Sequence, residues 1–112
     1  MTLGLGESLA WWLDAVALKT SSARTLETYG RIGRAFTQFA AQQGATALAE
    51  VTPALLRQYL AAMRARGCRP HTVRQHYRTL KAWLRWCVRE ELLPYDPTRR
   101  VEPPSAPVSV RW

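Results

Sequence analysis

The sequence lacks the features that mark several large classes of protein. Its 112 residues include only two cysteines, Cys68 and Cys87, and two histidines. The cysteines do not form a C-x-x-C pair, and the two histidines are too irregularly spaced to complete a zinc site. We therefore expect two reduced thiols, with Cys87 packed as a small hydrophobic residue and Cys68 in a turn. We expect no bound metal and no cofactor.

Long apolar runs are also missing. The longest run near the amino terminus covers residues 9–13 and stops at Asp14, which is far too short to cross a membrane. The amino terminus has no basic stretch of the kind that opens a signal peptide. These absences predict a cytoplasmic protein that has no membrane partner.

Motifs of common catalytic sites are absent as well. The chain contains no G-x-S-x-G, no Gly-rich phosphate loop and no H-E-x-x-H. Residues 71–74 do match H-x-x-R, a spacing found in enzymes that cut DNA. Such a site needs several cationic donors and a nucleophile drawn from distant parts of a fold, and no companions of this kind can be identified. We expect no catalytic residue and no small-molecule substrate.

Acidic residues are scarce in one part of the chain. The formal charge of the protein is +8, and residues 1–56 contribute nothing to it because their charges cancel. Residues 57–100 hold eleven basic side chains and three acidic ones, which accounts for the whole excess. Between Arg69 and Arg89 there is no Asp or Glu at all. Charge concentrated in this way indicates a surface that binds a polyanion.

Apolar residues spaced three and four apart predict four helices and no strand. The predicted helices cover about residues 8–19, 23–43, 53–66 and 70–91. Ser22 and Thr52 are candidate amino-terminal caps, and Gly44 and Gly67 are candidate left-handed stops. The fold class is therefore all-α, in one domain over residues 1–97. Three prolines in the short polar stretch 98–112 predict an extended linker or tail.

Basic side chains line a face of two predicted helices, away from the apolar stripe. In the helix over 70–91 this row lies roughly 120° around the helix from the apolar residues. Cations four residues apart repel one another unless acidic residues pair with them, so an uncompensated row favours a bound nucleic acid over a solvated surface. The candidate DNA-binding residues are Arg24, Arg31, Arg34, Arg69, His71, Thr72, Arg74, Gln75, Arg78, Lys81 and Arg85.

An alternative function rests on the first helix. Trp11 and Leu18 form an apolar stripe beside the one made by Leu9, Trp12 and Val16, so this helix is apolar on two sides. A helix of that kind is either enclosed by its own domain or offered to another molecule. The rival interpretation is a helical adaptor that binds a protein partner through Trp11 and Leu18.

Several short motifs, taken in order, are shared with one known family. They are a Ser/Thr start followed by Tyr29 and Phe36, Val51-Thr52 entering the third helix, Gly67 before Thr72-Val73, and a closing Asp96-Pro97 where the family usually has Asn-Pro. Over about residues 8–104 the chain resembles the amino-terminal core-binding domain of tyrosine recombinases, the phage-integrase family.

The resemblance implies a SAM-like bundle of two crossed helical hairpins that ends in an extended proline-containing tail. In that family the second and fourth helices face the major groove of double-stranded DNA, and other recombinase subunits are partners on the DNA. The resemblance therefore implies a DNA-binding domain that acts in DNA recombination and integration. The family's catalytic residues lie in a second domain, toward which residues 98–112 would lead, so His71 and Arg74 are not counted among them. The parent protein is expected to be a tyrosine recombinase that breaks and rejoins DNA strands.

Overall fold

The predicted helices are present, with small shifts at their ends. The computed structural model describes residues 2–105. Its elements are α1 (Leu5–Lys19), α2 (Ala23–Gln42), η1 (Leu48–Glu50), α3 (Pro53–Ala65), α4 (Pro70–Arg89) and η2 (Pro97–Arg100), where η marks a short 3₁₀ helix. Within the described residues strand-type pairing is limited to one isolated bridge between Gly4 and Ala47. The all-α fold class is confirmed.

Side-chain caps explain where the helices begin. The hydroxyl of Ser22 accepts a hydrogen bond from the Thr25 N–H at 3.1 Å, and that of Thr52 accepts one from the Leu55 N–H at 3.1 Å. Each cap satisfies a backbone donor that has no partner inside the helix. α1 begins three residues before its expected start, because the Glu7 carboxylate turns back to accept the Gly4 N–H at 2.8 Å.

Three of the helices end in the same left-handed turn. Gly44 after α2 and Gly67 after α3 have φ of 86° and 84°, values that glycine adopts without a steric penalty. The predicted stops are therefore confirmed. The turn after α4 places Glu91 at φ 60°, and the Leu92 N–H returns to the Cys87 carbonyl at 2.8 Å. A side chain in this region costs roughly 1 kcal/mol.

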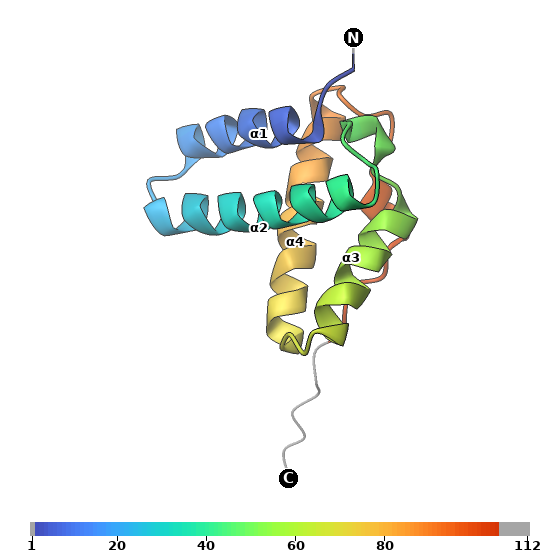
Figure 1. Ribbon diagram of the computed structural model, residues 1–112. Coiled ribbons are helices and arrows are strands. Elements are labelled where there is room, and N and C mark those ends of the chain that lie inside the picture. The colour runs from blue at the N-terminus through green and yellow to red at the C-terminus, as the bar shows by residue number, and fades with distance from the viewer. Residues whose placement is uncertain (1, 106–112) are drawn as a thin grey trace.

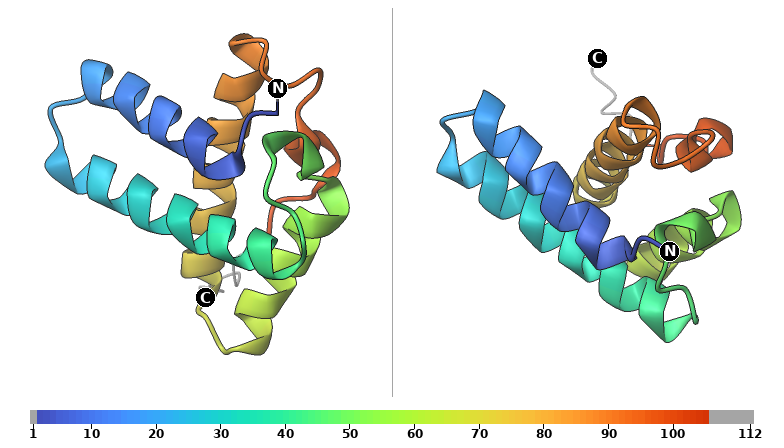
Figure 2. Two further views of the ribbon diagram at one scale, coloured as in Figure 1. Left: turned by 45° about the horizontal axis from the view of Figure 1, so that its top comes forward. Right: turned by 90° about the horizontal axis from the view of Figure 1, so that it is seen from above.

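The helices pair into two hairpins that cross. α1 and α2 run antiparallel, as do α3 and α4, and the second hairpin lies across the first (Figure 1). Seen from above, α4 passes against the α1–α2 hairpin while α3 lies farther along it (Figure 2). α4 contacts all three other helices, so side chains on several of its faces have to pack against neighbouring helices.

The crossing point is filled by aromatic rings. Trp83 of α4 is 0% exposed; it stacks on Trp12 with ring centroids 6.2 Å apart and meets the edge of Phe36 at the same distance. Cys87 is buried beside it and Cys68 is half-buried in the turn before α4, as predicted. Burial of side chains this large supplies roughly 2–3 kcal/mol each, which holds the two hairpins at a fixed angle.

The chain after α4 differs from the expectation of an unpaired segment starting at Thr98. Residues 97–100 form η2, Val101 is 5% exposed, and the Tyr77 hydroxyl donates to the Val101 carbonyl at 3.3 Å. The Asp96 carboxylate caps η2 by accepting the Thr98 N–H at 2.8 Å. The packed part of the chain therefore reaches Val101, because a buried valine and an Asp cap offset the proline-rich composition. The predicted linker partly lies outside the described residues.

Candidate nucleic-acid interface

The outer face of α4 carries most of the residues predicted to bind DNA. His71, Gln75, Arg78 and Arg85 are exposed, whereas Thr72, Arg74 and Lys81 are half-buried. Arg69 is exposed at the amino-terminal cap position of the same helix. The buried side of α4 holds the apolar stripe, so the two sets of side chains separate as the helical spacing predicts.

The basic row of α2 is divided between two sides of the helix. Arg24 and Arg31 are exposed. Arg34 is exposed as well, but its guanidinium folds back over Gly30, where an added Cβ would lie 2.9 Å from its Nη1 atom. Arg34 also lines a groove beside Leu9 and Leu13 of α1. The structure therefore separates Arg34 from Arg31, although the sequence places them in one row.

The carboxylates of the described residues do not neutralise these arginines through hydrogen bonds. Within residues 2–105, Glu7, Glu50 and Asp96 accept hydrogen bonds, and each takes them from its own local segment. The hydrogen bonds that arginine side chains donate there go to the Arg100 carbonyl and to the Cys68 sulfur. The positive charge on α2 and α4 is thus left to solvent or to a ligand.

The two flanks of α4 face different neighbours. On one flank the Lys81 ammonium lies 5.8 Å from the ring centroid of Tyr77, whose hydroxyl bonds the C-terminal segment. On the other flank lie His76 and, one turn earlier on the same face, Thr72. The outer row of α4 therefore lies between a flank covered by the C-terminal segment and a flank that meets α2 and α3.

A polar pocket of about 290 Å³ lies where α2, α3 and α4 meet. It is lined by Ala35, Gln38, Phe39, Gln42, Tyr59, Arg66 and His76. The Tyr59 hydroxyl and His76 Nδ1 are 2.8 Å apart and buried. Desolvation lowers the pKa of His76 to about 4, with added effects from Arg31 and Arg66, and burial raises the pKa of Tyr59 to about 12. Both side chains are therefore uncharged near pH 7.

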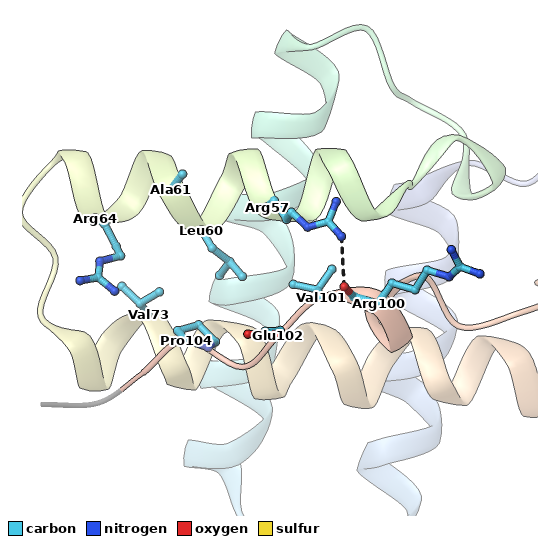
Figure 3. A pocket seen from close by; sticks show the side chains of 9 residues that line it. All are labelled: Arg57, Leu60, Ala61, Arg64, Val73, Arg100, Val101, Glu102 and Pro104. Atoms are coloured by element: carbon cyan, nitrogen blue, oxygen red, sulfur yellow. Dashed lines mark hydrogen bonds between the residues drawn. The ribbon is translucent and has the colours of Figure 1, made fainter. Parts of the chain in front are cut away.

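A larger groove of about 560 Å³ lies on the opposite side of the α3–α4 hairpin. The C-terminal segment runs along it between the two helices (Figure 3). The Arg57 Nη2 atom donates to the Arg100 carbonyl at 3.0 Å, and Arg64 and Glu102 line the same groove. On this side, therefore, the Arg57 guanidinium is hydrogen-bonded to the backbone of the chain itself.

Four polar residues of the α2–α3–α4 pocket were not predicted from the sequence: Gln38, Gln42, Arg66 and His76. His76 lies at the edge of the apolar stripe of α4, where helical spacing alone indicates a core histidine. A signal was nevertheless available, since a buried Tyr59 needs a hydrogen-bond partner. The partner residue could not be chosen without knowing how α3 and α4 face each other.

The residues of the rival interpretation are also at the surface. Trp11 is 50% exposed and Leu18 is 89% exposed, whereas the adjacent Trp12 is buried. Among the described residues no group of three or more His, Cys, Asp or Glu side chains lies close enough to hold a metal ion. No helix in that part of the chain has the length and apolar character needed to cross a membrane.

Two crossed hairpins with an arginine-rich outer face define a class of small all-helical domain, and the comparisons identify it. The chain matches the family described as "Phage integrase, N-terminal SAM-like domain" over residues 9–91 and belongs to this family. The resemblance seen in the sequence is confirmed. No curated protein matches the chain.

Two solved structures share the fold. The N-terminal domain of a phage integrase/site-specific recombinase from Haloarcula marismortui superposes with a TM-score of 0.82 at 23% identity, covering 93% of this chain and 99% of that one. A lambda integrase (75-356) dimer bound to a COC' core site superposes with a TM-score of 0.77 at 16% identity, covering 95% of this chain and 37% of that one. The SAM-like bundle of two crossed hairpins is confirmed.

Proposed function

We propose that this chain is the DNA-binding domain of a site-specific recombinase or integrase, and that it grips duplex DNA in the major groove through α2 and α4. The observation that carries the proposal is the set of outward arginines on these two helices, which donate no hydrogen bond to a carboxylate within the described residues. The major groove is wide enough to admit an α-helix. The lambda integrase with the same fold is bound to a core site, which supports a DNA partner.

The proposed contacts divide by chemistry. Arg78 and Arg85, in the middle of the outer face of α4, bind phosphates or guanine edges, for which the planar guanidinium is well suited. Thr72 and Gln75 near the start of the helix add a phosphate contact and a base-edge contact. The remaining members of the proposed interface are Arg24, Arg31, Arg34, Arg69, His71, Arg74 and Lys81. Strand cleavage and rejoining belong to a separate catalytic domain of the parent recombinase, with other subunits assembled on the DNA.

A salt series tests the proposal directly. If about five phosphates are neutralised, the logarithm of the association constant falls with the logarithm of salt concentration with a slope of roughly −4 to −5. Fluorescence anisotropy with a labelled duplex measures this slope. A flat response, or no binding at low salt, defeats the proposal.

A double substitution assigns the interface to α4. Replacing Arg78 and Lys81 with Ala removes two cations and should reduce the slope by nearly two units, while the circular dichroism spectrum stays helical. Neither side chain belongs to the buried core, so the helices should form without them, although Lys81 loses its contact with the Tyr77 ring. An unchanged slope removes these two residues from the interface.

Trp11 and Leu18 are exposed, which favours a second candidate function, the binding of a protein partner through this surface of α1. Changing both residues to polar ones abolishes adaptor binding but leaves the affinity for duplex DNA intact. In the recombinase interpretation this surface faces another subunit, so the same variant then loses assembly on DNA and keeps the binding of a single domain.

A further inference from the structure

We propose that the junction of α2, α3 and α4 is a phosphate-binding subsite, in which Arg31 and Arg66 hold one DNA backbone phosphate against the imidazole of His76. This inference rests on the proposed DNA-binding function and deepens it. It adds to the interface two residues, Arg66 and His76, that lie outside the basic rows of α2 and α4. It also gives the buried Tyr59 a role in binding.

His76 is a polar side chain fixed at the wall of a pocket. Its ring is 7% exposed, and its Nδ1 atom is occupied by the Tyr59 hydroxyl at 2.8 Å. Within the described residues, Trp83 Nε1 is the buried side-chain polar atom that lacks a hydrogen-bond partner. His76 Nε2 makes no hydrogen bond within the described residues and is not among these buried unpaired atoms, so it keeps some access to solvent. The pocket that the ring lines gives it this access.

In the proposed subsite His76 Nε2 is a hydrogen-bond donor. A neutral imidazole carries one proton, and Tyr59 can donate its own hydroxyl proton to Nδ1 only if Nδ1 is bare. The bond between these two atoms can run in either direction, depending on the tautomer of His76. In the proposed subsite Tyr59 is the donor, because its hydroxyl proton has no other acceptor among the hydrogen bonds of the described residues, and the proton of His76 then lies on Nε2. The lowered pKa of His76 and the raised pKa of Tyr59 keep both groups in these forms near pH 7. The ring therefore presents an N–H to the pocket without the charge that would repel the nearby arginines.

The surrounding cations lack the partner that such a cluster needs. Arg31 of α2 and Arg66 after α3 are both near enough to lower the pKa of His76. Arg66 donates only a long contact of 3.9 Å to the Cys68 sulfur, and the residues lining the pocket include no carboxylate. Arg66 lines the pocket together with His76, and Arg31 lies one helical turn before Ala35, which lines the pocket from α2. One guanidinium in the pocket wall, a second one turn away and an imidazole N–H form a set of donors that fits a phosphate oxygen. Gln38 and Gln42 add amide donors at the rim.

The location favours a phosphate of the DNA backbone over a free anion. The pocket is lined by residues of α2 and α4, the two helices whose outer faces carry the proposed contacts, and by Tyr59 and Arg66. A helix that enters the major groove brings its flanks close to the phosphates at the groove edge. A phosphate held here fixes the angle of the α3–α4 hairpin on the duplex, because the three donors come from α2, from α4 and from the turn after α3.

Arg64 supplies a matched control for Arg66. Both are exposed arginines at the end of α3, two residues apart, so they contribute alike to net charge. Arg64 lines the opposite groove with the C-terminal segment (Figure 3), whereas Arg66 lines the pocket of His76. Any general effect of positive charge on DNA affinity is the same for the two substitutions.

The first experiment compares Arg66→Ala with Arg64→Ala in the anisotropy salt series. One lost phosphate contact makes the slope less steep by about one unit. If the variant and the unmodified protein bind equally at 1 M salt, the variant then binds roughly eightfold more weakly at 0.1 M salt. We expect this loss for Arg66→Ala and an unchanged slope for Arg64→Ala. Equal losses, or no loss in either variant, overturn the subsite. If the unsubstituted domain shows no salt-dependent binding to DNA, the proposed function itself is wrong, and the subsite is wrong with it.

The second experiment observes the imidazole. The ¹⁵N resonance of His76 Nε2 should shift when duplex DNA is added and, at much higher concentration, when inorganic phosphate is added. In Arg66→Ala both shifts should be lost, while other residues on α4 still respond to DNA. Tyr59→Phe tests the positioning role: it leaves Nδ1 unpaired, so the Nε2 shift should shrink while helicity is retained. A His76 resonance that does not respond to DNA in the parent protein contradicts the proposal even if the salt series agrees with it.

Discussion

The two sides of the α3–α4 hairpin are lined by similar residues but have opposite surroundings. On the side of the C-terminal segment, Arg57 is bonded to the Arg100 carbonyl and the Tyr77 hydroxyl to the Val101 carbonyl. On the side of α2, the Tyr59 hydroxyl is paired with His76, and Arg66 is exposed, with no stretch of residues 2–105 covering it. Each side thus has a tyrosine facing inward and an arginine at its edge. Only on the side of the C-terminal segment does the arginine, Arg57, donate a hydrogen bond to the backbone of the chain.

This difference shows that a count of arginines does not locate a binding surface. Arginines satisfied by carbonyls of the chain stabilise the fold, and those left without a partner are available to a ligand. The distinction arises from connectivity, because residues 97–101 pass along one side of the hairpin and not along the other. The predictions below test the contrast, beginning with the largest expected effect.

The buried pair on the α2 side should make stability depend on pH. In the folded protein the pKa of His76 is about 4, below its ordinary value of 6.5. The unfolded chain therefore binds a proton between pH 6.5 and 4 that the folded chain does not, so stability is full above pH 6.5 and falls as the pH drops toward 4. The expected loss is about 2–3 kcal/mol, measured by urea unfolding at a series of pH values.

The matched control removes both partners of the pair. In Tyr59→Phe/His76→Phe no polar group of the pair is left unpaired, so we expect little change in stability at pH 7. The double variant should lose the dependence between pH 6.5 and 4, apart from the part that carboxylates cause in both proteins. An equally steep profile in the double variant contradicts the assignment to His76.

On the other side, the C-terminal segment should contribute to stability and not to DNA affinity. Val101→Ala removes buried methyl groups and should destabilise the domain by roughly 1–2 kcal/mol. The midpoint of urea unfolding measures the loss, and anisotropy at low temperature should show unchanged affinity for duplex DNA. A loss of affinity without a loss of stability would place this side in the interface and break the comparison.

Much of this fold was predictable because its signals are local. Apolar spacing located all four helices, and Ser22, Thr52 and Gly67 marked ends that the structure confirms. The start of α1 and the packing of η2 were missed, since a Glu7 that folds back and a valine buried after two arginines leave no periodic trace. At the candidate site the sequence predicted an outward row on α4. It could not separate Arg34 from Arg31, nor pair Tyr59 with His76, because these depend on how the hairpins cross.

Arg57 should matter less than Val101, although on the same side. Arg57→Ala removes a hydrogen bond from a charged donor to the Arg100 carbonyl at an exposed position, so the expected loss of stability is roughly 0.5–1 kcal/mol. The affinity for DNA should change only slightly, because Arg57 is a single positive charge outside the proposed interface. Thermal unfolding followed by circular dichroism measures the first quantity. A salt slope reduced by a full unit would mean that Arg57 contacts a phosphate.

The smallest effect is also the most direct check on the geometry of the α2 side. Since Arg31 lowers the pKa of His76 by repelling its charged form, Arg31→Ala should raise that pKa. Arg34→Ala should leave it unchanged, because the Arg34 guanidinium lies over Gly30 and lines the groove beside α1. A pH titration of the His76 carbon-bound protons by NMR distinguishes the two variants without any DNA. Equal shifts in both would mean that Arg31 is no nearer to His76 than Arg34 is, and the proposed phosphate subsite would lose one of its two cations and keep only Arg66.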